Sequence, residues 1–339
     1  MVIANGAHTR RCPPNESTYP LRVDASISVD RIAEAAEAID PVFRDTPQFV
    51  SEPLSSRLGV SVVLKVETVN PIRSFKGRGA DYLLQRVDSQ PSGFVCASAG
   101  NFGQGMAYAA RKRGMSLTVF AAVTANPLKV DRMRALGAKV ILEGQDFDEA
   151  KDRALRRATE TGAFYVEDGL LGPIAEGAGT IAAELGRMDD PLDACIVPLG
   201  NGSLINGMGL WLKRFSPSTR VIAVCANGAP AMSLSWRAGR PVSTQSIDTI
   251  ADGIGVRVPV PEALEILRSA VDDVMLVSDP EIVEAMRWLH RDEGLVVEPA
   301  GAAGIAAVAK SKDELAGRRV AVPLTGGNMT EEQIRTWLY

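Results

Sequence analysis

The chain has 339 residues, of which 46% are hydrophobic, and a formal net charge of −4. This length allows one large or two medium domains and a core that keeps a catalytic cleft dry. Positive and negative residues are scattered along the chain, so we expect no nucleic-acid partner. Apolar runs such as 60–66 are strand-length, far short of the roughly 20 residues of a membrane helix, so we expect no membrane partner.

The N-terminal stretch 1–25 contains arginine, proline and asparagine but no apolar segment of the signal-peptide type. We therefore expect a flexible N-terminal arm over 1–25 and a cytoplasmic protein. The strand and helix patterns described below begin after this arm.

Cysteine and histidine are too few and too dispersed for several common catalytic and metal sites. The cysteines are Cys12, Cys96, Cys195 and Cys225, and the histidines are His8 and His290. No C-x-x-C pair occurs and the last three cysteines lie in apolar strand-like runs, so we expect buried free thiols. A Ser-His-Asp or Cys-His site would have to use His290, which has no nucleophile motif beside it. Histidine-rich zinc sites are excluded.

From about residue 60, short β-branched runs alternate with segments whose apolar residues recur at helical spacing. The expected strands are 60–66, 93–97, 117–122, 139–142, 194–198, 221–225, 274–277 and 320–324. The expected helices include 126–136, 147–161, 174–187 and 280–291. This alternation is typical of parallel sheets covered by helices, so the predicted fold class is α/β.

Three glycine-rich turns follow expected strands and precede helical patterns, at 98–105, 200–207 and 325–328. Ligands bind at such turns in open α/β sheets. In the turn 200–204, small residues let backbone N–H groups approach an anion at a helix N-terminus, which predicts a phosphate cradle. The turn is neither a Walker loop nor an intact G-x-G-x-x-G, and a tight turn without a ligand explains it equally well.

One lysine, Lys76, lies among small and apolar residues in the stretch 70–80, just after a buried-looking strand. We expect an interaction-poor pocket around it, in which a lysine is cheaper to deprotonate, as imine formation with an aldehyde requires. The alternative is an ordinary surface lysine at a helix start.

Taken together, these stretches resemble the tryptophan synthase β-type (fold type II) pyridoxal-phosphate enzymes, and within them the threonine and serine dehydratases. The resemblance covers nearly all of 46–328. Its motifs are S-F-K-G-R-G-A at 74–80, A-S-A-G-N-F-G-Q at 97–104, P-L-G-N-G-S-L at 198–204, E-P-A-G-A at 298–302 and L-T-G-G-N at 324–328.

The resemblance implies two open, twisted, mainly parallel sheets flanked by helices, with the cofactor in the cleft between a large and a small lobe. It implies a discontinuous large pyridoxal-phosphate-binding domain of 26–92 and 167–339 and a small domain of 93–166. It also implies a homodimer.

Each residue that matches a family motif inherits an expected role. Lys76 would bind pyridoxal 5'-phosphate as a Schiff base and act as the base that removes the α-proton. Asn101 would hydrogen-bond the ring hydroxyl, and Thr325 would face the ring nitrogen. The expected cofactor-binding residues are Phe75, Lys76, Asn101, Gly200, Asn201, Gly202, Ser203, Leu204, Glu298 and Thr325. The expected substrate-binding residues are Ser98, Ala99, Gly100, Asn101, Gln104 and Arg73.

The resemblance favours elimination over racemisation. Racemases similar to these dehydratases carry a serine on the cofactor face opposite the lysine, where this chain has Ala99. A hydroxyl at Thr325 cannot fix a protonated ring nitrogen as a carboxylate does, and the weaker electron sink suits elimination better than transamination. We therefore expect a pyridoxal-phosphate-dependent ammonia-lyase, a carbon-oxygen lyase. It would convert a 3-hydroxy amino acid such as L-threonine or L-serine to a 2-oxo acid and ammonia.

Several features depart from the closest dehydratases. The phosphate loop reads G-N-G-S in place of four glycines, so Asn201 and Ser203 can add contacts of their own. Arg73 replaces a small residue and either contacts a larger or acidic substrate or pairs on the surface. The stretch 226–230 lacks the glutamate with which many relatives bind a divalent cation, so we expect no metal there and a structural role for Asp252. Thr325 can also be read as a turn hydroxyl.

Two other functions stay open. β-Replacement, in which an enzyme of this type adds a nucleophile, is the main alternative, because A-N-G-A-P at 226–230 is faintly similar to threonine synthases. A non-catalytic nucleotide-binding module would also explain the glycine turns. Since the chain ends soon after 328, we expect no isoleucine-binding regulatory module. The choice among 3-hydroxy amino acids depends on pocket shape, which separates one methylene by only about 1–3 kcal/mol.

Overall fold

The computed structural model describes residues 25–87 and 91–339. Nearly all of the expected arm, with Cys12 and His8, lies outside the described residues. Within them, no helix combines the length and the apolar character that crossing a membrane requires.

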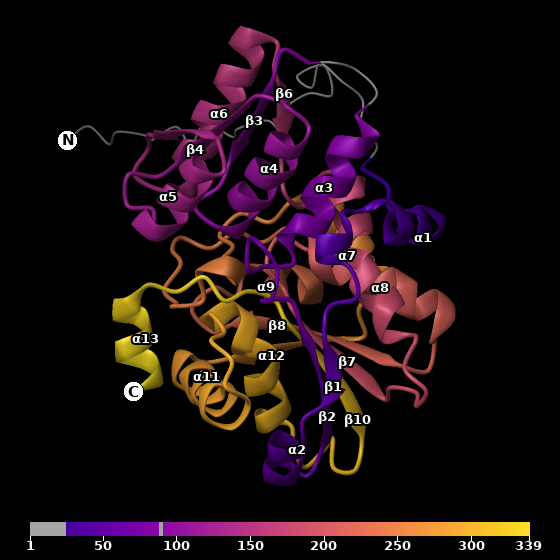
Figure 1. Ribbon diagram of the computed structural model, residues 1–339. Coiled ribbons are helices and arrows are strands. Elements are labelled where there is room, and N and C mark those ends of the chain that lie inside the picture. The colour runs from indigo at the N-terminus through magenta and orange to yellow at the C-terminus, as the bar shows by residue number, and fades with distance from the viewer. Residues whose placement is uncertain (1–24, 88–90) are drawn as a thin grey trace, which may run out of the picture.

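A sheet of six strands forms the larger half of the described chain, the lower half in Figure 1. In spatial order its strands are β1 (Gln48–Val50), β2 (Ser61–Val66), β10 (Arg319–Leu324), β7 (Ala194–Pro198), β8 (Arg220–Ala226) and β9 (Asp273–Val277). Neighbouring strands are parallel, except that the edge strand β1 runs antiparallel to β2.

A second sheet, of four strands among the described residues, forms the upper half in Figure 1. Its order is β5 (Lys139–Leu142), β4 (Leu117–Ala121), β3 (Phe94–Ala97) and β6 (Phe164–Val166), and all its pairs are parallel. Two mainly parallel sheets with helices between their strands confirm the expected α/β class.

Helices connect and cover these strands. In the first half of the chain they are α1 (Val29–Ala38), α2 (Glu52–Leu58), α3 (Lys76–Arg86), α4 (Asn101–Lys112), α5 (Pro127–Ala135), α6 (Phe147–Thr161) and α7 (Gly172–Leu185). In the second half they are α8 (Ser203–Phe215), α9 (Ala231–Ala238), α10 (Pro261–Ala270), α11 (Asp279–Glu293), α12 (Pro299–Lys310) and α13 (Glu331–Leu338). The short 3₁₀ helices η2 (Pro41–Phe43) and η3 (Asp252–Ile254) complete the described elements.

Local sequence signals explain where the helices begin and end. Helix α6 begins after Asp146, whose carboxylate accepts a hydrogen bond from the Glu149 amide, and ends at Gly162, which has a φ of 66°. Helix α11 begins after Ser278, which forms a capping box with Glu281. Such caps satisfy N–H groups that the helix itself leaves free, and glycine adopts positive φ without strain.

Alternate side chains of the larger sheet build two apolar layers. Val62 and Leu64 belong to the core that α11 and α12 cover, whereas Val63, Cys195 and Ala223 belong to the core under α7 and α8. Successive strand residues point to opposite faces, so a sheet covered on both faces needs apolar residues at every strand position. The central strands therefore appear in the sequence as continuous apolar runs.

The smaller sheet is covered on both faces too. Phe94 and Cys96 pack with α4 and α5, and Val95 and Tyr165 pack against the alanine face of α6. Leu83 of α3 joins the first of these two cores, although the expected domain boundary at 92 assigns α3 to the large domain. That boundary stays a prediction.

The expected strands agree with the observed ones to within one residue, and the expected helices to within two. Two strands were not predicted, β1 (Gln48–Val50) and β6 (Phe164–Val166). Each spans three residues, which is too short for an apolar run or an alternation to stand out from its neighbours.

A buried cluster of four charges joins β2 to α3 and α7. The Arg78 guanidinium donates hydrogen bonds to Glu67 at 2.8 Å and to Glu184 at 2.6 Å, and Lys65 Nζ donates to Glu184. All four side chains are at most 5% exposed, and their formal charges cancel. Removing one partner would leave a buried charge uncompensated, which is strongly destabilising. The cluster therefore fixes helix α3 against its neighbours.

The stability of the fold should depend on pH through Glu184. Burial opposes its ionisation, but hydrogen bonds and charges from Arg78 and Lys65 outweigh burial and lower its pKa from 4.5 to about 2. The ionised form thus contributes stability above pH 4.5, on the order of 3 kcal/mol, and this contribution is lost as pH falls from 4.5 towards 2. Urea unfolding at several pH values should show Glu184→Gln less stable than wild type at pH 6, with a narrowing difference below pH 4.5. A constant difference would contradict this assignment.

Helices α7 and α8 approach each other closely at Gly207. A Cβ atom added there would lie 1.9 Å from the Ala175 carbonyl oxygen. We expect Gly207→Ala to lower the free energy of unfolding by about 1–3 kcal/mol, because the helices must separate. Gly186→Ala is the control, since its Cβ would lie 3.5 Å from the nearest atom. Denaturant titration measures both variants, and equal stability of the two would show that the crossing tolerates the methyl group.

Candidate active site

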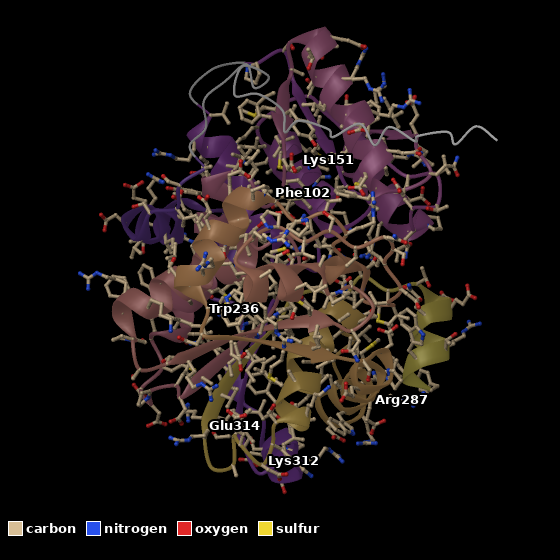
Figure 2. All side chains as sticks on the ribbon, turned by 180° about the vertical axis from the view of Figure 1, so that it is seen from behind. Phe102, Lys151, Trp236, Arg287, Lys312 and Glu314 are labelled. Atoms are coloured by element: carbon tan, nitrogen blue, oxygen red, sulfur yellow. The ribbon has the colours of Figure 1, made fainter. Side chains whose placement is uncertain are left out.

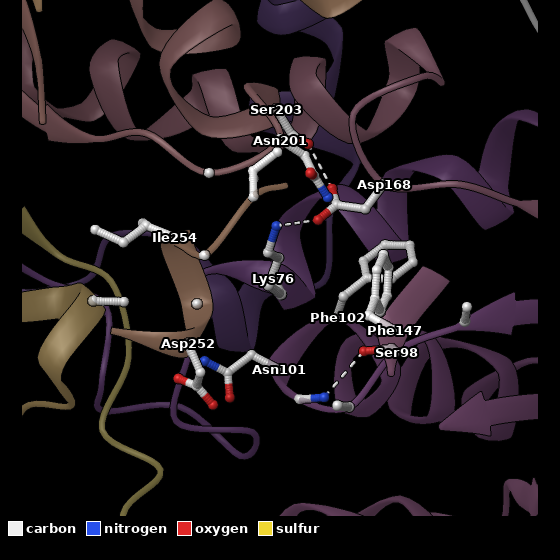
Figure 3. A pocket seen from close by; sticks show the side chains of 18 of the residues that line it. Lys76, Ser98, Asn101, Phe102, Phe147, Asp168, Asn201, Ser203, Asp252 and Ile254 are labelled. Carbon is white, nitrogen blue, oxygen red and sulfur yellow. Dashed lines mark hydrogen bonds and ion pairs between the residues drawn. The ribbon is translucent and has the colours of Figure 1, made fainter. Parts of the chain in front are cut away.

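A cleft of about 390 Å³ is lined by residues from both sheets. The lining segments follow the carboxyl ends of β3, β6, β7 and β10. This edge of a parallel sheet is the usual ligand site, because its loops lead into helix N-termini. Figure 3 shows the cleft from close by. In the reverse view of Figure 2, Phe102 and Lys151, which both line it, lie in the upper half of the molecule.

The turn after β7 opens helix α8 and forms one anion site. Gly202 has a φ of 100°, in the left-handed region that favours glycine. No side chain caps α8, so its first backbone N–H groups, from Ser203 onward, have no partner within the helix. Together with the positive end of the helix dipole, these donors attract an anion.

The turn after β3 opens helix α4 and forms a second anion site. Ser98 Oγ accepts hydrogen bonds from the amides of Gly100, at 3.2 Å, and Gly103, at 2.9 Å. Gly100 is the N-cap and has no side chain to offer the helix. The amides of Asn101 and Phe102 therefore remain available, a geometry that suits a carboxylate.

Lys76 is the first residue of α3, and the loop before it is held from two sides. The side-chain amide nitrogen of Asn70, Nδ2, donates a hydrogen bond to the Ser74 carbonyl at 3.1 Å. Ser74 Oγ and the Phe75 amide both donate to the Thr325 carbonyl, each at 3.1 Å. The segment after β10 thus determines where Lys76 enters the cleft.

The expected interaction-poor surroundings of Lys76 are wrong. Its Nζ atom lies 2.6 Å from Asp168 Oδ2, 4.8 Å from the centroid of the Phe75 ring and 5.8 Å from that of Phe102. The other Asp168 oxygen accepts a hydrogen bond from Ser203 Oγ at 2.5 Å, as Figure 3 shows. The physical reason is strand β6, which was not predicted and which carries Asp168 into the cleft just beyond its end.

Asn101 is held by two polar side chains. Its Nδ2 atom donates to Glu298 Oε1 at 2.5 Å, and its Oδ1 atom accepts from Asn328 Nδ2 at 2.8 Å. Glu298 is buried, and this burial raises the pKa of its carboxyl group. With the acceptor and the donor of its amide both engaged, Asn101 has a fixed orientation in the cleft.

Lys129 of α5 reaches across to acidic groups of the larger half. Its Nζ atom lies 2.7 Å from Asp252 and 3.8 Å from Glu298. Burial opposes its charge, but the two carboxylates outweigh burial and raise the pKa of Lys129. A Cβ added at Gly100 would lie 3.6 Å from the lysine side chain, so this cation adds positive charge beside the second anion site. Asp252 lines the cleft as well, so its expected structural role is too narrow.

The cleft collects most of the residues expected from sequence. They are Phe75, Lys76, Ser98, Ala99, Gly100, Asn101, Gly200, Asn201, Gly202, Ser203, Leu204, Glu298 and Thr325. Gln104 and Arg73 are not among the lining residues. Gln104 is 1% exposed in the second turn of α4. Arg73 lies near Arg132, whose pKa is lowered by burial and by the Arg73 charge. A direct contact between Arg73 and a substrate is therefore not supported.

Sequence reasoning missed Asp168 and Lys129. Recognising 164–166 as a strand would have pointed to the acid that follows it, since polar residues after parallel strands face ligands. Lys129 lies beside Val130 and Met133 on the buried side of α5. In the sequence, a lysine on the apolar side of a predicted helix was the signal that could have indicated a buried, functional Lys129.

Among the described residues, the cysteines are not suited to nucleophilic chemistry and no side-chain cluster suits a metal ion. Cys96, Cys195 and Cys225 are free and buried, as expected, and burial raises the pKa of each thiol to about 12. Thiols of this kind are not nucleophiles at neutral pH. Across 25–87 and 91–339, no group of three or more His, Cys, Asp or Glu side chains is placed to hold a metal ion.

Comparisons with known proteins agree with this geometry. Residues 39–326 match the family model described as pyridoxal-phosphate dependent enzyme. The chain belongs to this family. An L-threonine ammonia-lyase of Thermotoga maritima is 36% identical over 310 residues, 91% of this chain and 77% of that protein.

Solved structures of the same kind superpose closely. Maize serine racemase gives a TM-score of 0.86 at 29% identity, with 91% of this chain and 96% of that chain covered. The processed form of threonine deaminase isoform 2 from Solanum lycopersicum gives a TM-score of 0.84 at 28% identity, with 94% of this chain and 98% of that chain covered.

The cleft fits the cofactor of this family. The uncapped N-terminus of α8 offers N–H donors to a phosphate, and Lys76 offers the amine that binds the cofactor aldehyde. Asn101, oriented by Glu298, would meet the ring hydroxyl, and Thr325 would face the ring nitrogen. The N-terminus of α4 stays available for the carboxylate of an amino acid.

Lys76→Ala should abolish the imine of pyridoxal phosphate. The purified wild-type protein should show the visible absorption of a lysine–cofactor imine, and reduction with borohydride should attach the cofactor covalently. The variant should show neither, because it lacks the amine at the start of α3 that lies beside the N-terminus of α8. Lys213→Ala, a change at a lysine paired with Asp272 and outside the lining residues, is the control. A reducible imine that persists without Lys76 would assign the cofactor to another lysine.

Proposed function

We propose that this enzyme is a pyridoxal-phosphate-dependent ammonia-lyase. It converts a 3-hydroxy amino acid, such as L-threonine or L-serine, to a 2-oxo acid and ammonia by α,β-elimination. The observation that carries the proposal is the position of Lys76 in one cleft with two uncapped helix N-termini, those of α4 and α8.

The two anion sites, at the N-termini of α8 and α4, bind different groups. The N-terminus of α8 binds the cofactor phosphate, and the N-terminus of α4, with Lys129 close by, binds the substrate carboxylate. An amino acid held by its carboxylate at the N-terminus of α4, with the cofactor phosphate at the N-terminus of α8, would have its α-carbon near Lys76. Binding at the phosphate site and at the carboxylate site thus orients the Cα–H bond toward Lys76.

Proton transfer then depends on the protein's own groups. When bound, pyridoxal phosphate supplies a conjugated ring that accepts the electron pair released at the α-carbon. Lys76 Nζ takes the α-proton. Asn101, fixed between Glu298 and Asn328, orients the ring, and the Thr325 hydroxyl meets the ring nitrogen without adding a charge.

Ala99 supports elimination over racemisation. It lines the cleft with a methyl group, so it has no proton to return to the α-carbon. The acid Asp168 does not replace it, because Asp168 hydrogen-bonds Lys76 itself and so lies beside the lysine. Proton removal therefore occurs from the lysine side alone.

The relatives support the same reaction class. Their names include L-threonine ammonia-lyase and threonine deaminase. β-Replacement is the second candidate, since it shares every step up to loss of the β-substituent. A non-catalytic nucleotide-binding module has no support from a family match that spans 39–326.

We further propose an amino acid substrate, a cytoplasmic location and a homodimer. The names of the relatives support the amino acid substrate. The dimer rests on the resemblance to the family.

Incubation with L-threonine or L-serine alone tests the function. The expected products are equal amounts of 2-oxo acid and ammonia, measured by separate dehydrogenase-coupled assays. Lys76→Ala should lower the rate at least about 10²-fold, the usual contribution of a catalytic base. If 2-oxo acid is absent but an added nucleophile yields a new amino acid, the enzyme is a β-replacement enzyme. Appearance of the D-amino acid without ammonia would make it a racemase.

A further inference from the structure

Asp168 is an acid beside the N-terminus of α8, the expected phosphate site. It follows β6, and its side chain is 13% exposed. One carboxylate oxygen lies 2.6 Å from Lys76 Nζ, and the other accepts a hydrogen bond from Ser203 Oγ at 2.5 Å. Figure 3 shows the carboxylate between these two side chains. Asp168 therefore touches both the catalytic lysine and the first residue of the phosphate-binding helix.

A carboxylate at this place conflicts with a bound phosphate. Both would be negative and both would contact the start of α8, while Lys76 Nζ, once bonded to the cofactor aldehyde, would have fewer N–H donors to offer the carboxylate. A neutral acid at this place would remove the conflict, because it would offer the phosphate no like charge and would carry an O–H donor. The same proton is useful to the reaction, since hydroxide is a poor leaving group.

We propose that Asp168 is the acid that protonates the departing hydroxyl group. This inference rests on the proposed elimination reaction. Lys76 Nζ takes the α-proton, and the electron pair of the Cα–H bond forms the Cα=Cβ bond. The Cβ–O bond breaks with its electron pair on oxygen, which takes the proton of Asp168 and leaves as water. The Lys76 ammonium then returns a proton to Asp168 across the 2.6 Å contact, and both groups are restored.

Contacts separate Asp168 from the other acids of the cleft. Glu298 is hydrogen-bonded to Asn101, Asp252 to Lys129, Glu167 to Lys151 and Asp148 to Arg257, and Asp146 caps helix α6. Among the described residues that line the cleft, Asp168 is the carboxylate that lies within hydrogen-bond distance of Lys76, the lysine that collects the α-proton. It is therefore the acid placed to pass that proton on.

Leaving-group dependence tests the proposal. Asp168→Asn keeps the size of the side chain and removes the transferable proton. Its rate with L-threonine should fall about 10²–10⁴-fold, the range for a general acid. Its rate with L-β-chloroalanine should change less than about 10-fold, because chloride leaves without protonation. Asp168→Glu, which keeps the proton, should recover part of the threonine activity.

A second readout does not depend on turnover. Titration of the apoprotein with pyridoxal phosphate, followed by visible absorption, should show that Asp168→Asn binds the cofactor at least as tightly as wild type, because asparagine is neutral without first taking up a proton. Asp45→Asn is the matched control. Asp45 pairs with the exposed Arg187 and its φ of 50° suits asparagine, so cofactor binding and both rates should be unchanged.

Each other outcome overturns the proposal. Equal losses with both substrates would make Asp168 a positioning residue for Lys76, and loss of cofactor binding in both Asp168 variants would make it part of the binding site. If the rate of Asp168→Asn with L-threonine is unchanged, another group, such as the cofactor phosphate, protonates the departing hydroxyl group. If wild type forms no 2-oxo acid from either substrate, the proposed function fails, and that failure is visible before any variant is made.

Discussion

Helix N-termini that meet in one cleft are the constraint on which the site depends. Helices α3, α4, α8 and α12 all begin at the cleft, and in none of them does the side chain of the N-cap residue cap the helix. Each leaves free N–H groups and the positive end of a dipole. Parallel strands produce this arrangement, because every strand sends its carboxyl end, and the helix start that follows, to the same edge. A cleft of this kind favours ligands with two anionic ends, and an amino acid joined to pyridoxal phosphate has them.

The free N–H groups and the positive ends of these helices also determine where the protein's own acidic side chains can lie. Glu298 is used to orient Asn101 and Asp168 to hold Lys76. In each case a buried or half-buried carboxylate has a donor within hydrogen-bond distance, as the cost of burying a charge requires. The catalytic groups are therefore positioned by acids that the helix termini and lysines keep in place.

Distances across the cleft are set by how closely three helices pack. Added Cβ atoms would collide at Gly79 with the Ile174 carbonyl, at Gly177 with the Arg78 carbonyl and at Gly207 with the Ala175 carbonyl. These contacts join α3 to α7 and α7 to α8, and so join the helix that begins at Lys76 to the helix that begins at the phosphate cradle. The buried charge cluster around Arg78 acts on the first of these contacts.

The sequence alone determined the α/β class, the central strands and the three glycine-rich turns, because continuous apolar runs and glycine after a strand are local signals. It also determined Lys76 and Asn101 as site residues through motif resemblance. Only the tertiary structure decided that Asp168 meets Lys76, that Lys129 meets Asp252 and Glu298, and that Arg73 stays outside the cleft. Lys76 and Asp168 are 92 positions apart in the sequence, and Lys129 is 123 positions from Asp252 and 169 from Glu298. No local sequence pattern indicates contacts between residues so far apart. They depend on how the ends of separate strands are brought to one edge.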